Sequence, residues 1–395
     1  MAETENTKTY IYSCRVIPPE ERDVARAYQR NPREMHHAEI GEMRQLSVDL
    51  TDEGAQAYAR SSNLIEIEEE TEAVAEGWVE RGTELMDEVA SVANFPAIPP
   101  TEDTNYGRST WLRSSAGKQG AGVKVAVLDT ALGAATARML RNYIVGHKSW
   151  VGGSALGGNN DHGSHCACTA LPDKAKLLHG AVLANNGSGG TSGVIAAIHW
   201  AVDSGADIIS MSLSGPGNEA AYEQAIRRAR DKGVLVFCAS GNEAQKGNPK
   251  RFPGGCRSAI AVGAFDRASD RRASFSCHGA HVDIAHSGVS VLSYSARATL
   301  IRMSGTSQAT PNVAWTAAGL LAETGKRGDA LLAGLLSGAR KNGSAITHYG
   351  AGIADAQKSK GKLLIPSKPP KPEPQKPEPP EPNGSVKLFP LLKGR

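Results

Sequence analysis

The chain has 395 residues, of which 40% are hydrophobic and 22% are charged, as in ordinary soluble globular proteins with a buried core. Its 44 Lys and Arg residues nearly balance its 41 Asp and Glu residues, and the formal net charge is +3. This balance provides no basic field for nucleic acid or for an anionic membrane surface, so we expect neither as a partner.

The first residues, MAETENTKTYIYSC, lack the basic start and apolar run of a signal peptide, and no later apolar stretch is long enough to span a membrane. We expect a cytoplasmic protein as the sequence is written, or a secreted one if a signal peptide has been removed. The six cysteines are too few and too scattered for a disulfide framework. Free buried thiols are favoured over a bond from Cys238 to Cys256 or Cys277.

Residues 8–70 alternate between strand-like and helix-like patterns, which predicts a small α+β module. The strand-like segments are TYIYSCRVI, RQLSVDL and LIEIEEE, and helical periodicity runs through PPEERDVARAYQR and DEGAQAYARS. We assign residues 1–76 to this module and residues 77–120 to a connector.

From Gly122 onward, short apolar runs alternate with helical segments of small residues; the runs include VKVAVLD, AKLLHGAVL, ADIISMSL, VLVFCAS and SAIAVGA. Strands without polar alternation are buried on both faces. Residues 121–365 therefore predict an α/β domain, a doubly wound, mostly parallel sheet with helices on both faces. Functional groups of such sheets lie beyond the carboxyl ends of the strands.

Residues 366–395 form a tail rich in Pro, Lys and Glu, which cannot bury enough apolar area to fold. We expect it to be disordered and extended. A docking peptide in its last residues, VKLFPLLKGR, is the alternative.

Four polar residues stand at strand ends or helix starts of the predicted sheet. Asp129 closes VKVAVLD, His162 lies in NNDHGSHCACTA, Asn242 follows VLVFCAS, and Ser307 lies in SGTSQATP. A nucleophilic serine needs a base and an acid that orients the base, and an amide can stabilise an oxyanion. Taken singly, Asp129 can be explained as a turn former, His162 as a loop histidine and Ser307 as a helix cap.

Together these segments resemble the subtilisin-like serine proteases, the subtilase family, over about residues 122–364. The matching motifs are VAVLDTA, HGSHCACT, SGN and GTSQATPNVA, which occur in the order of the family. The resemblance implies that Ser307 is the nucleophile, His162 the general base and acid, Asp129 its orienting partner, and Asn242 an oxyanion donor. The backbone N–H of Ser307 is then the second donor.

Two further stretches, NGSGGTSG and SLSGPG, are similar to the family segments that pair with an extended peptide substrate. Such recognition by strand addition reads the backbone of the substrate. The implied substrate-binding residues are Gly187, Ser188, Gly189, Ser212, Leu213, Ser214, Gly241 and Arg251.

The module of residues 1–76 resembles, more weakly, the inhibitory propeptide of subtilases. The resemblance implies that LIEIEEETEAVAE enters the cleft and that the enzyme cuts its own chain near Glu76 and Gly77. By the same resemblance, Arg251 falls where many family members have a small residue at the base of the pocket for the residue before the cut bond, which predicts a preference for acidic residues there. The alternative is that Arg251 is a solvated loop residue and that the match is off by one or two positions. Pairing of Arg251 with Glu243 would weaken the preference.

The chain departs from the family pattern at four positions, which leaves the turnover rate and the shape of the cleft open: Ala131, Gln308, Asn312 and Trp315. Within SGTSQATP, Thr306 is expected to cap the helix that carries the serine. Pro311 is expected close to the first turn of that helix, where a missing N–H costs little.

We predict no cofactor and no metal. Calcium remains open, but the segment TALPDKAKLL is shorter than the loop that holds the family's tight calcium site. A zinc site is the competing hypothesis, with four potential ligands: His162, His165, Cys166 and Cys168. Ligands so closely spaced at one helix start cannot all face one ion.

The sequence therefore predicts a serine endopeptidase made as a self-inhibited precursor. Processing of one dedicated substrate competes with general degradation within this class. A catalytically weak or inactive module that holds an extended peptide in the same cleft is the alternative from another class.

Overall fold

The computed structural model describes the backbone of residues 8–15, 37–40, 43–50, 64–69, 71–75, 78–79, 120–343 and 346–364, and the side chains of residues 71–75, 120–343 and 348–364. The chain divides into two compact units, Met1–Leu364 and Ile365–Arg395. The predicted proline-rich tail falls in the second unit, outside the described residues.

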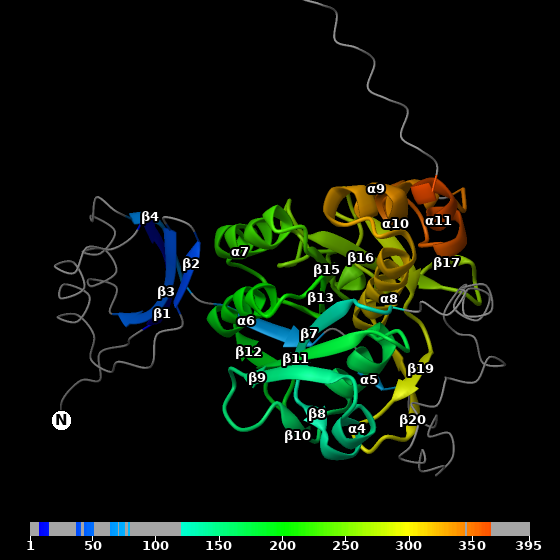
Figure 1. The fold of residues 1–395 in the computed structure, drawn as a ribbon. Helices are drawn as coiled ribbons and strands as arrows, with labels where there is room; N and C mark the ends of the chain where they lie inside the picture. Colours follow the sequence, from blue (N-terminus) through cyan, green and yellow to red (C-terminus); the bar gives the residue numbers. More distant parts are fainter. Residues whose placement is uncertain are drawn as a thin grey trace, which may run out of the picture. The chain divides into compact units, whose positions relative to one another are not determined.

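An eight-stranded sheet forms the centre of the larger unit (Figure 1). Its order is β17-β16-β15-β13-β7-β11-β9, with β18 added beside β16. Every pairing is parallel except that of β16 with β17. The strands are β7 (Lys124–Thr130), β9 (Ile144–Ser149), β11 (Lys176–Leu183), β13 (Ile208–Met211), β15 (Leu235–Ala239), β16 (Ile260–Asp266), β17 (Arg271–Arg272) and β18 (Ile284–Ser287).

Helices cover both faces of this sheet (Figure 1). Val125 and Val127 of β7 pack in one core with helices α5 (Asp161–Ala170) and α8 (Thr306–Thr324). Ala126 and Leu128 of the same strand pack in the other core, with α6 (Thr191–Asp203) and α7 (Glu219–Asp231). Because successive side chains of a strand point to opposite faces, an unbroken apolar run is what two buried faces require. The predicted α/β fold is confirmed.

The N-terminal segments form a four-stranded antiparallel sheet of order β2-β3-β1-β4. Its strands are β1 (Lys8–Arg15), β2 (His37–Ile40), β3 (Met43–Leu50) and β4 (Leu64–Glu69). The three strands predicted here are confirmed, with β2 in addition. The two predicted helical segments lie outside the described residues.

Two short segments that follow this sheet in sequence pair with strands of the larger domain. Strand β5 (Glu72–Ala75) lies between β12 (Ser188–Gly190) and β14 (Leu213–Ser214) in a three-stranded antiparallel sheet. Strand β6 (Trp78–Val79) extends a second sheet of order β19-β20-β6, formed with β19 (Val291–Tyr294) and β20 (Leu300–Ser304). Strand β6 thus lies within the predicted connector of residues 77–120.

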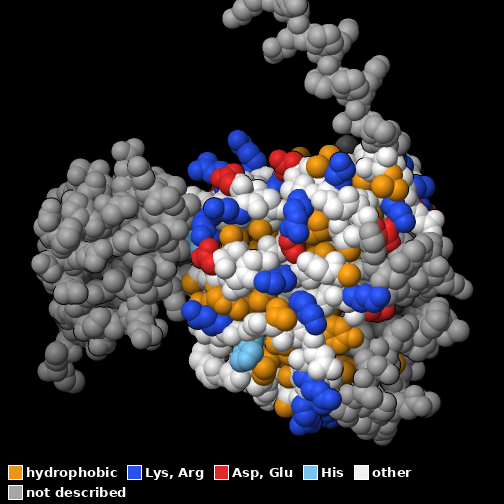
Figure 2. Space-filling view, in the orientation of Figure 1, with side chains coloured by type: hydrophobic (Ala, Val, Ile, Leu, Met, Phe, Trp, Pro, Cys, Tyr) orange, Lys and Arg blue, Asp and Glu red, His pale blue; other side chains and the backbone are white. Residues whose placement is uncertain are grey.

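The remaining elements lie around the central sheet: β8 (Leu132–Gly133), α4 (Ala134–Met139), β10 (Leu156–Gly158), η3 (Ala244–Lys246), α9 (Gly328–Gly338), α10 (Ile346–Tyr349) and α11 (Ala356–Leu364). Within the described part of the chain, no helix is both long enough and apolar enough to cross a membrane. On the face shown in Figure 2, Lys and Arg side chains are interspersed with apolar and acidic ones.

Candidate active site

A buried carboxylate and imidazole meet where β7 ends and α5 begins. Asp129 is the next-to-last residue of β7, and His162 is the second residue of α5. The side chain of Asn160 caps this helix by accepting a hydrogen bond from the His162 N–H at 2.9 Å. The Nδ1 atom of His162 lies 2.7 Å from Oδ1 of Asp129. The strand end and the capped helix therefore fix the imidazole from two directions.

The electrostatics of this pair make His162 a stronger base. Burial by itself lowers the pKa of His162, but the charge and hydrogen bond of Asp129, together with those of Cys166, outweigh burial, and the net pKa is raised well above the ordinary value. With Nδ1 held by Asp129, the Nε2 atom is left to exchange protons. In the described part of the chain, Nε2 of His162 is buried without a hydrogen-bond partner.

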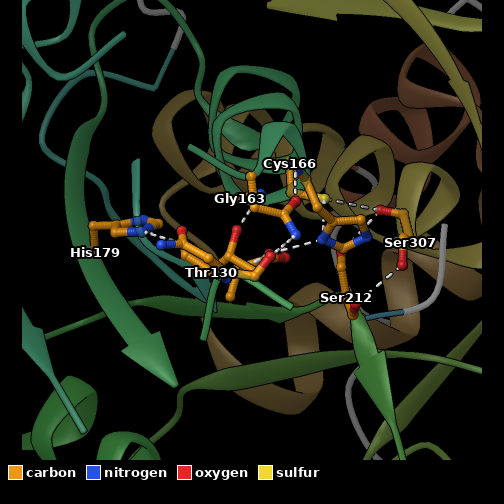
Figure 3. A network of polar contacts seen from close by, with 10 residues as sticks. Thr130, Gly163, Cys166, His179, Ser212 and Ser307 are labelled. Carbon is orange, nitrogen blue, oxygen red and sulfur yellow. Dashed lines mark hydrogen bonds and ion pairs between the residues drawn. The ribbon is translucent and has the colours of Figure 1, made fainter. Parts of the chain in front are cut away.

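A second histidine, which the sequence analysis missed, supports this pair through Thr130. The Nε2–H of His179 donates to the backbone oxygen of Thr130 at 2.9 Å, and Thr130 Oγ1 accepts the N–H of Gly163 at 2.9 Å (Figure 3). Burial lowers the pKa of His179 to about 4, so its ring is neutral. The only signal in the sequence is one histidine inside the apolar strand AKLLHGAVL.

Ser307 is held at the start of α8 by Ser212. Because Pro311 has no N–H, the carbonyl of Ser307 lacks its helical donor. That carbonyl accepts hydrogen bonds from Ser212 Oγ at 2.8 Å and Cys166 Sγ at 3.5 Å instead. In return, Ser307 Oγ donates to the backbone oxygen of Ser212 at 3.0 Å (Figure 3). Pro311 thus leaves the carbonyl of Ser307 free to accept the hydrogen bond from Ser212, which positions the predicted nucleophile.

Cys166 connects the two halves of the site. Its Sγ lies 3.9 Å from Nδ1 of His162 and 3.5 Å from the backbone carbonyl oxygen of Ser307. The structure therefore brings Asp129, His162 and Ser307 around one buried thiol. The bond from the Ser307 hydroxyl to His162 is not made, since this hydroxyl donates to Ser212.

Asn242 is oriented by the residue before Ser307. It follows β15, and its Oδ1 accepts the backbone N–H of Thr306 at 2.9 Å and the Thr306 hydroxyl at 3.0 Å. With the oxygen engaged, only Nδ2 of this side chain can donate to an oxyanion. The expectation that Thr306 caps α8 is wrong, because Gly305 holds the cap position without a side-chain cap and the Thr306 hydroxyl bonds Asn242.

The segments predicted to bind substrate lie on both sides of β5. The Ala75 N–H donates to the oxygen of Gly187 at 2.9 Å. The paired positions are Val74 with Ser188 and Ser214, Ala73 with Gly189, and Ala75 with Leu213. Ala73 is fully buried. Five of the eight predicted binding positions thus pair with or bond to a strand of the chain's own N-terminal part, and Ser212 adjoins them in the sequence.

Arg251 lies next to the strand end that carries Asn242. It forms an ion pair with Glu243, each side chain 20% exposed, and Glu243 Oε2 also accepts the N–H of Asn242 at 3.1 Å. A Cβ added to Gly241 would come within 2.9 Å of Arg251 Cγ. The next residue, Phe252, bridges to the residue that follows β14. Arg251 therefore lies beside a segment that is predicted to bind substrate, and it makes the pairing with Glu243 that the sequence left open.

The four residues of the zinc hypothesis do not converge. His165 Nε2 donates to the oxygen of Val291 at 2.9 Å, and burial lowers the pKa of His165 to about 3. The metal-ligand atoms that do lie within 4.8 Å of one another belong to Asp129, His162 and Cys166. None of the five cysteines with described side chains forms a disulfide, and all five are buried, as predicted.

Three of the four departures from the family pattern, Gln308, Asn312 and Trp315, are buried in α8. Among the described residues, neither amide atom of Gln308 has a hydrogen-bond partner. Asn312, one turn further on, donates through Nδ2 to the oxygens of Ser287 and Gln308. The same helix thus holds one unsatisfied and one satisfied buried amide.

We expect Gln308→Met to raise the free energy of unfolding by about 1 kcal/mol, because it removes an unsatisfied buried amide at similar volume. Asn312→Leu is the matched control and is expected to lower it by about 1–3 kcal/mol, because it leaves the Ser287 carbonyl without its donor. Urea unfolding of both variants measures whether each change raises or lowers the free energy of unfolding. Equal destabilisation by both changes would contradict the assignment.

A parallel sheet that gathers a buried Asp–His pair, a serine at a helix start and a positioned asparagine amide has the design of a serine hydrolase. The model of the subtilase family matches residues 120–352. Subtilisin DY of Bacillus licheniformis is 35% identical over 255 residues, 61% of this chain and 92% of the relative. The chain therefore belongs to the subtilase family of serine proteases.

Two further relatives show the same extent of likeness. Thermitase of Thermoactinomyces vulgaris is 34% identical over 254 residues, which cover 61% of this chain and 89% of the relative. Subtilisin Savinase of Lederbergia lenta is 34% identical over 253 residues, which cover 61% of this chain and 91% of the relative. The likeness thus extends over nearly the whole of each relative.

Proposed function

We propose that the protein is a serine endopeptidase made as a self-inhibited precursor, with residues 121–365 as the protease and residues 1–76 as the inhibitory module. Ser307 Oγ attacks the peptide carbonyl while its proton moves to His162 Nε2, and Asp129 stabilises the imidazolium. Asn242 Nδ2 and the Ser307 N–H hold the oxyanion. His162 then returns the proton to the leaving amine as the C–N bond breaks, and water hydrolyses the acyl-enzyme in the same way.

One observation supports the precursor proposal: a strand of the chain's own N-terminal part pairs with the segments that are predicted to bind substrate. Strand β5 pairs with β12 and β14, and β6 pairs with β20, which ends at Ser304, just before Ser307. Only residues 76 and 77 separate β5 from β6. This register supports Glu76–Gly77 as the bond that is cut.

Arg251 supports a preference for an acidic residue before that bond. Glu243 occupies part of the guanidinium, but an arginine has five donors and can serve two carboxylates. Among the described residues, Nε of Arg251 is buried without a hydrogen-bond partner. Since Glu243 already neutralises Arg251, the preference is expected to be moderate.

The proposed chemistry uses protein groups alone, so no cofactor or metal takes part in it. A second candidate function is a catalytically weak or inactive peptide-binding module. The bond of Ser307 Oγ to Ser212 O, in place of one to His162, favours this candidate. Hydrogen bonds of catalytic groups are often made only when substrate is bound, which favours the protease.

The test is cleavage of peptides with the sequence of residues 71–80, TEAVAEGWVE, carrying Glu, Gln, Lys or Leu at position 76. We expect the processed protein to begin at Gly77 by mass spectrometry, and to cut the Glu peptide about tenfold faster than the Gln peptide. An Arg251→Gly variant is the control and is expected to lose the difference. Equal rates for Glu and Gln in the wild type, or a new N-terminus far from Gly77, would contradict the proposal.

A further inference from the structure

Three residues, Asn218, Thr191 and Gly217, contact the half-buried Thr71, the residue before β5, and together they are called the Thr71 pocket. The N–H of Thr71 donates to Oδ1 of Asn218 at 2.8 Å, and the Thr71 hydroxyl donates to the same oxygen. The backbone oxygen of Thr71 accepts the N–H of Thr191 at 3.1 Å and the Thr191 hydroxyl at 2.7 Å. Every polar group of Thr71 is therefore bound by the protease domain.

Asn218 is shaped for this contact. It holds the cap position of α7, yet its side chain makes no capping bond to that helix. Its backbone has φ of 60°, in the left-handed region that asparagine tolerates better than most residues. The residue is only 5% exposed. The local fold thus directs a buried carboxamide oxygen toward the incoming chain instead of the helix.

Gly217 provides space for the methyl group of Thr71. A Cβ added to Gly217 would come within 2.9 Å of Thr71 Cγ2. The pocket therefore fits both halves of a threonine side chain, the hydroxyl against Asn218 and the methyl against Gly217. A serine fits the first half, and a valine fits the shape but cannot donate to Asn218.

We propose that Asn218, Thr191 and Gly217 form a subsite that selects threonine five residues before the residue whose carbonyl is attacked. The proposal rests on the proposed function, in which Glu76 supplies that carbonyl. The bonds to the Thr71 backbone hold any residue, whereas the bond from its hydroxyl to Asn218 distinguishes threonine and serine from the rest. The subsite anchors the chain's own segment and reads the same position in other substrates.

The first test does not depend on catalysis. It measures hydrogen exchange of the β5 amides in the full-length Ser307→Ala protein, with Thr71→Val or Asn218→Gly added. Glycine keeps the left-handed backbone of residue 218 without strain. We expect about tenfold faster exchange in the Thr71→Val variant and a larger increase in the Asn218→Gly variant, which also removes the acceptor of the Thr71 N–H. Adding Thr71→Val to Asn218→Gly is then expected to increase exchange little further, because the shared hydrogen bond is already lost. The control is Glu72→Gln, an exposed neighbour, which is expected to leave exchange unchanged.

The second test measures kcat/KM of the processed wild-type protein on TEAVAEGWVE peptides with Thr, Ser or Val in first position. We expect Thr to exceed Val about tenfold, the Asn218→Gly protein to lose this difference, and the Gly217→Ala protein to prefer Ser to Thr. Two results overturn the proposal: equal exchange in Thr71→Val and Glu72→Gln proteins, or equal cleavage of Thr and Val peptides between Glu and Gly. Absence of cleavage, or cleavage at another bond, would instead overturn the proposed function. The hydrogen-exchange experiment would still test whether Asn218 binds the Thr71 hydroxyl, because it does not require catalysis.

Discussion

Replacing Ser307 with alanine is expected to lower peptide hydrolysis by about a millionfold, the size established for the triad of subtilisin. The variant has no oxygen to attack the carbonyl, so the acyl-enzyme cannot form. The full-length protein is then expected to keep its own N-terminus and to resist labelling by a fluorophosphonate. Mass spectrometry of the intact protein measures both effects.

The control is Ser337→Ala, which changes a serine of α9 outside the site and is expected to leave processing and labelling intact. Thermal unfolding of both variants verifies that the fold is kept. If the wild-type protein, correctly folded, shows neither processing nor labelling, the peptide-binding module replaces the protease as the function.

Replacing Asp129 with asparagine is expected to lower kcat by about ten-thousandfold, as in other serine proteases with this triad. The asparagine amide favours the wrong tautomer of His162, and the negative charge that stabilises the imidazolium is lost. The pH–rate profile gives a second readout. His162 must be neutral to act as a base, so activity rises with pH through its pKa.

Asp129 holds the pKa of His162 well above its ordinary value, whereas burial lowers it. In the Asp129→Asn variant the contributions of Asp129 are removed, while burial, the largest effect, still lowers the pKa and Cys166 still raises it. The acid limb of the kcat/KM profile is therefore expected to move to lower pH. An unchanged limb, measured with the residual activity, would show that Asp129 does not set the pKa of the catalytic base.

The fold could be predicted because its signal is local. The run VKVAVLD in β7 has no polar alternation because both of its faces are buried, one against α5 and α8 and the other against α6 and α7. Apolar length and helix spacing therefore sufficed to predict the class of sheet. The antiparallel pairing of β17 is confined to two residues and carries no such signal.

The candidate site could be predicted only in part, because its supporting contacts join distant residues. Strand ends and helix starts pointed to Asp129, His162, Asn242 and Ser307. The exchange of hydrogen bonds between Ser212 and Ser307 depends on how α8 meets β14, which no local pattern encodes. Thr306 has the local signature of a cap, but tertiary structure gives its hydroxyl to Asn242 instead.

The pocket for Thr71 was beyond prediction for the same reason. Thr71 and Asn218 are 147 positions apart, and in the sequence the asparagine has the ordinary meaning of a helix cap. Only the pairing of β5 with β14 brings the two together. The sequence likewise could not predict that the buried Gln308 amide lacks a hydrogen-bond partner among the described residues, because this depends on the side chains that pack around it.

Helix α8 is buried at every position from Thr306 to Leu321, so this part of the helix has no solvent-exposed face at which local unfolding could begin. Local opening begins where backbone is exposed and contacts are few, and such a helix offers neither. We therefore expect the helix that carries Ser307 to open late, together with the core around it, so that the predicted nucleophile keeps its position until the domain itself unfolds.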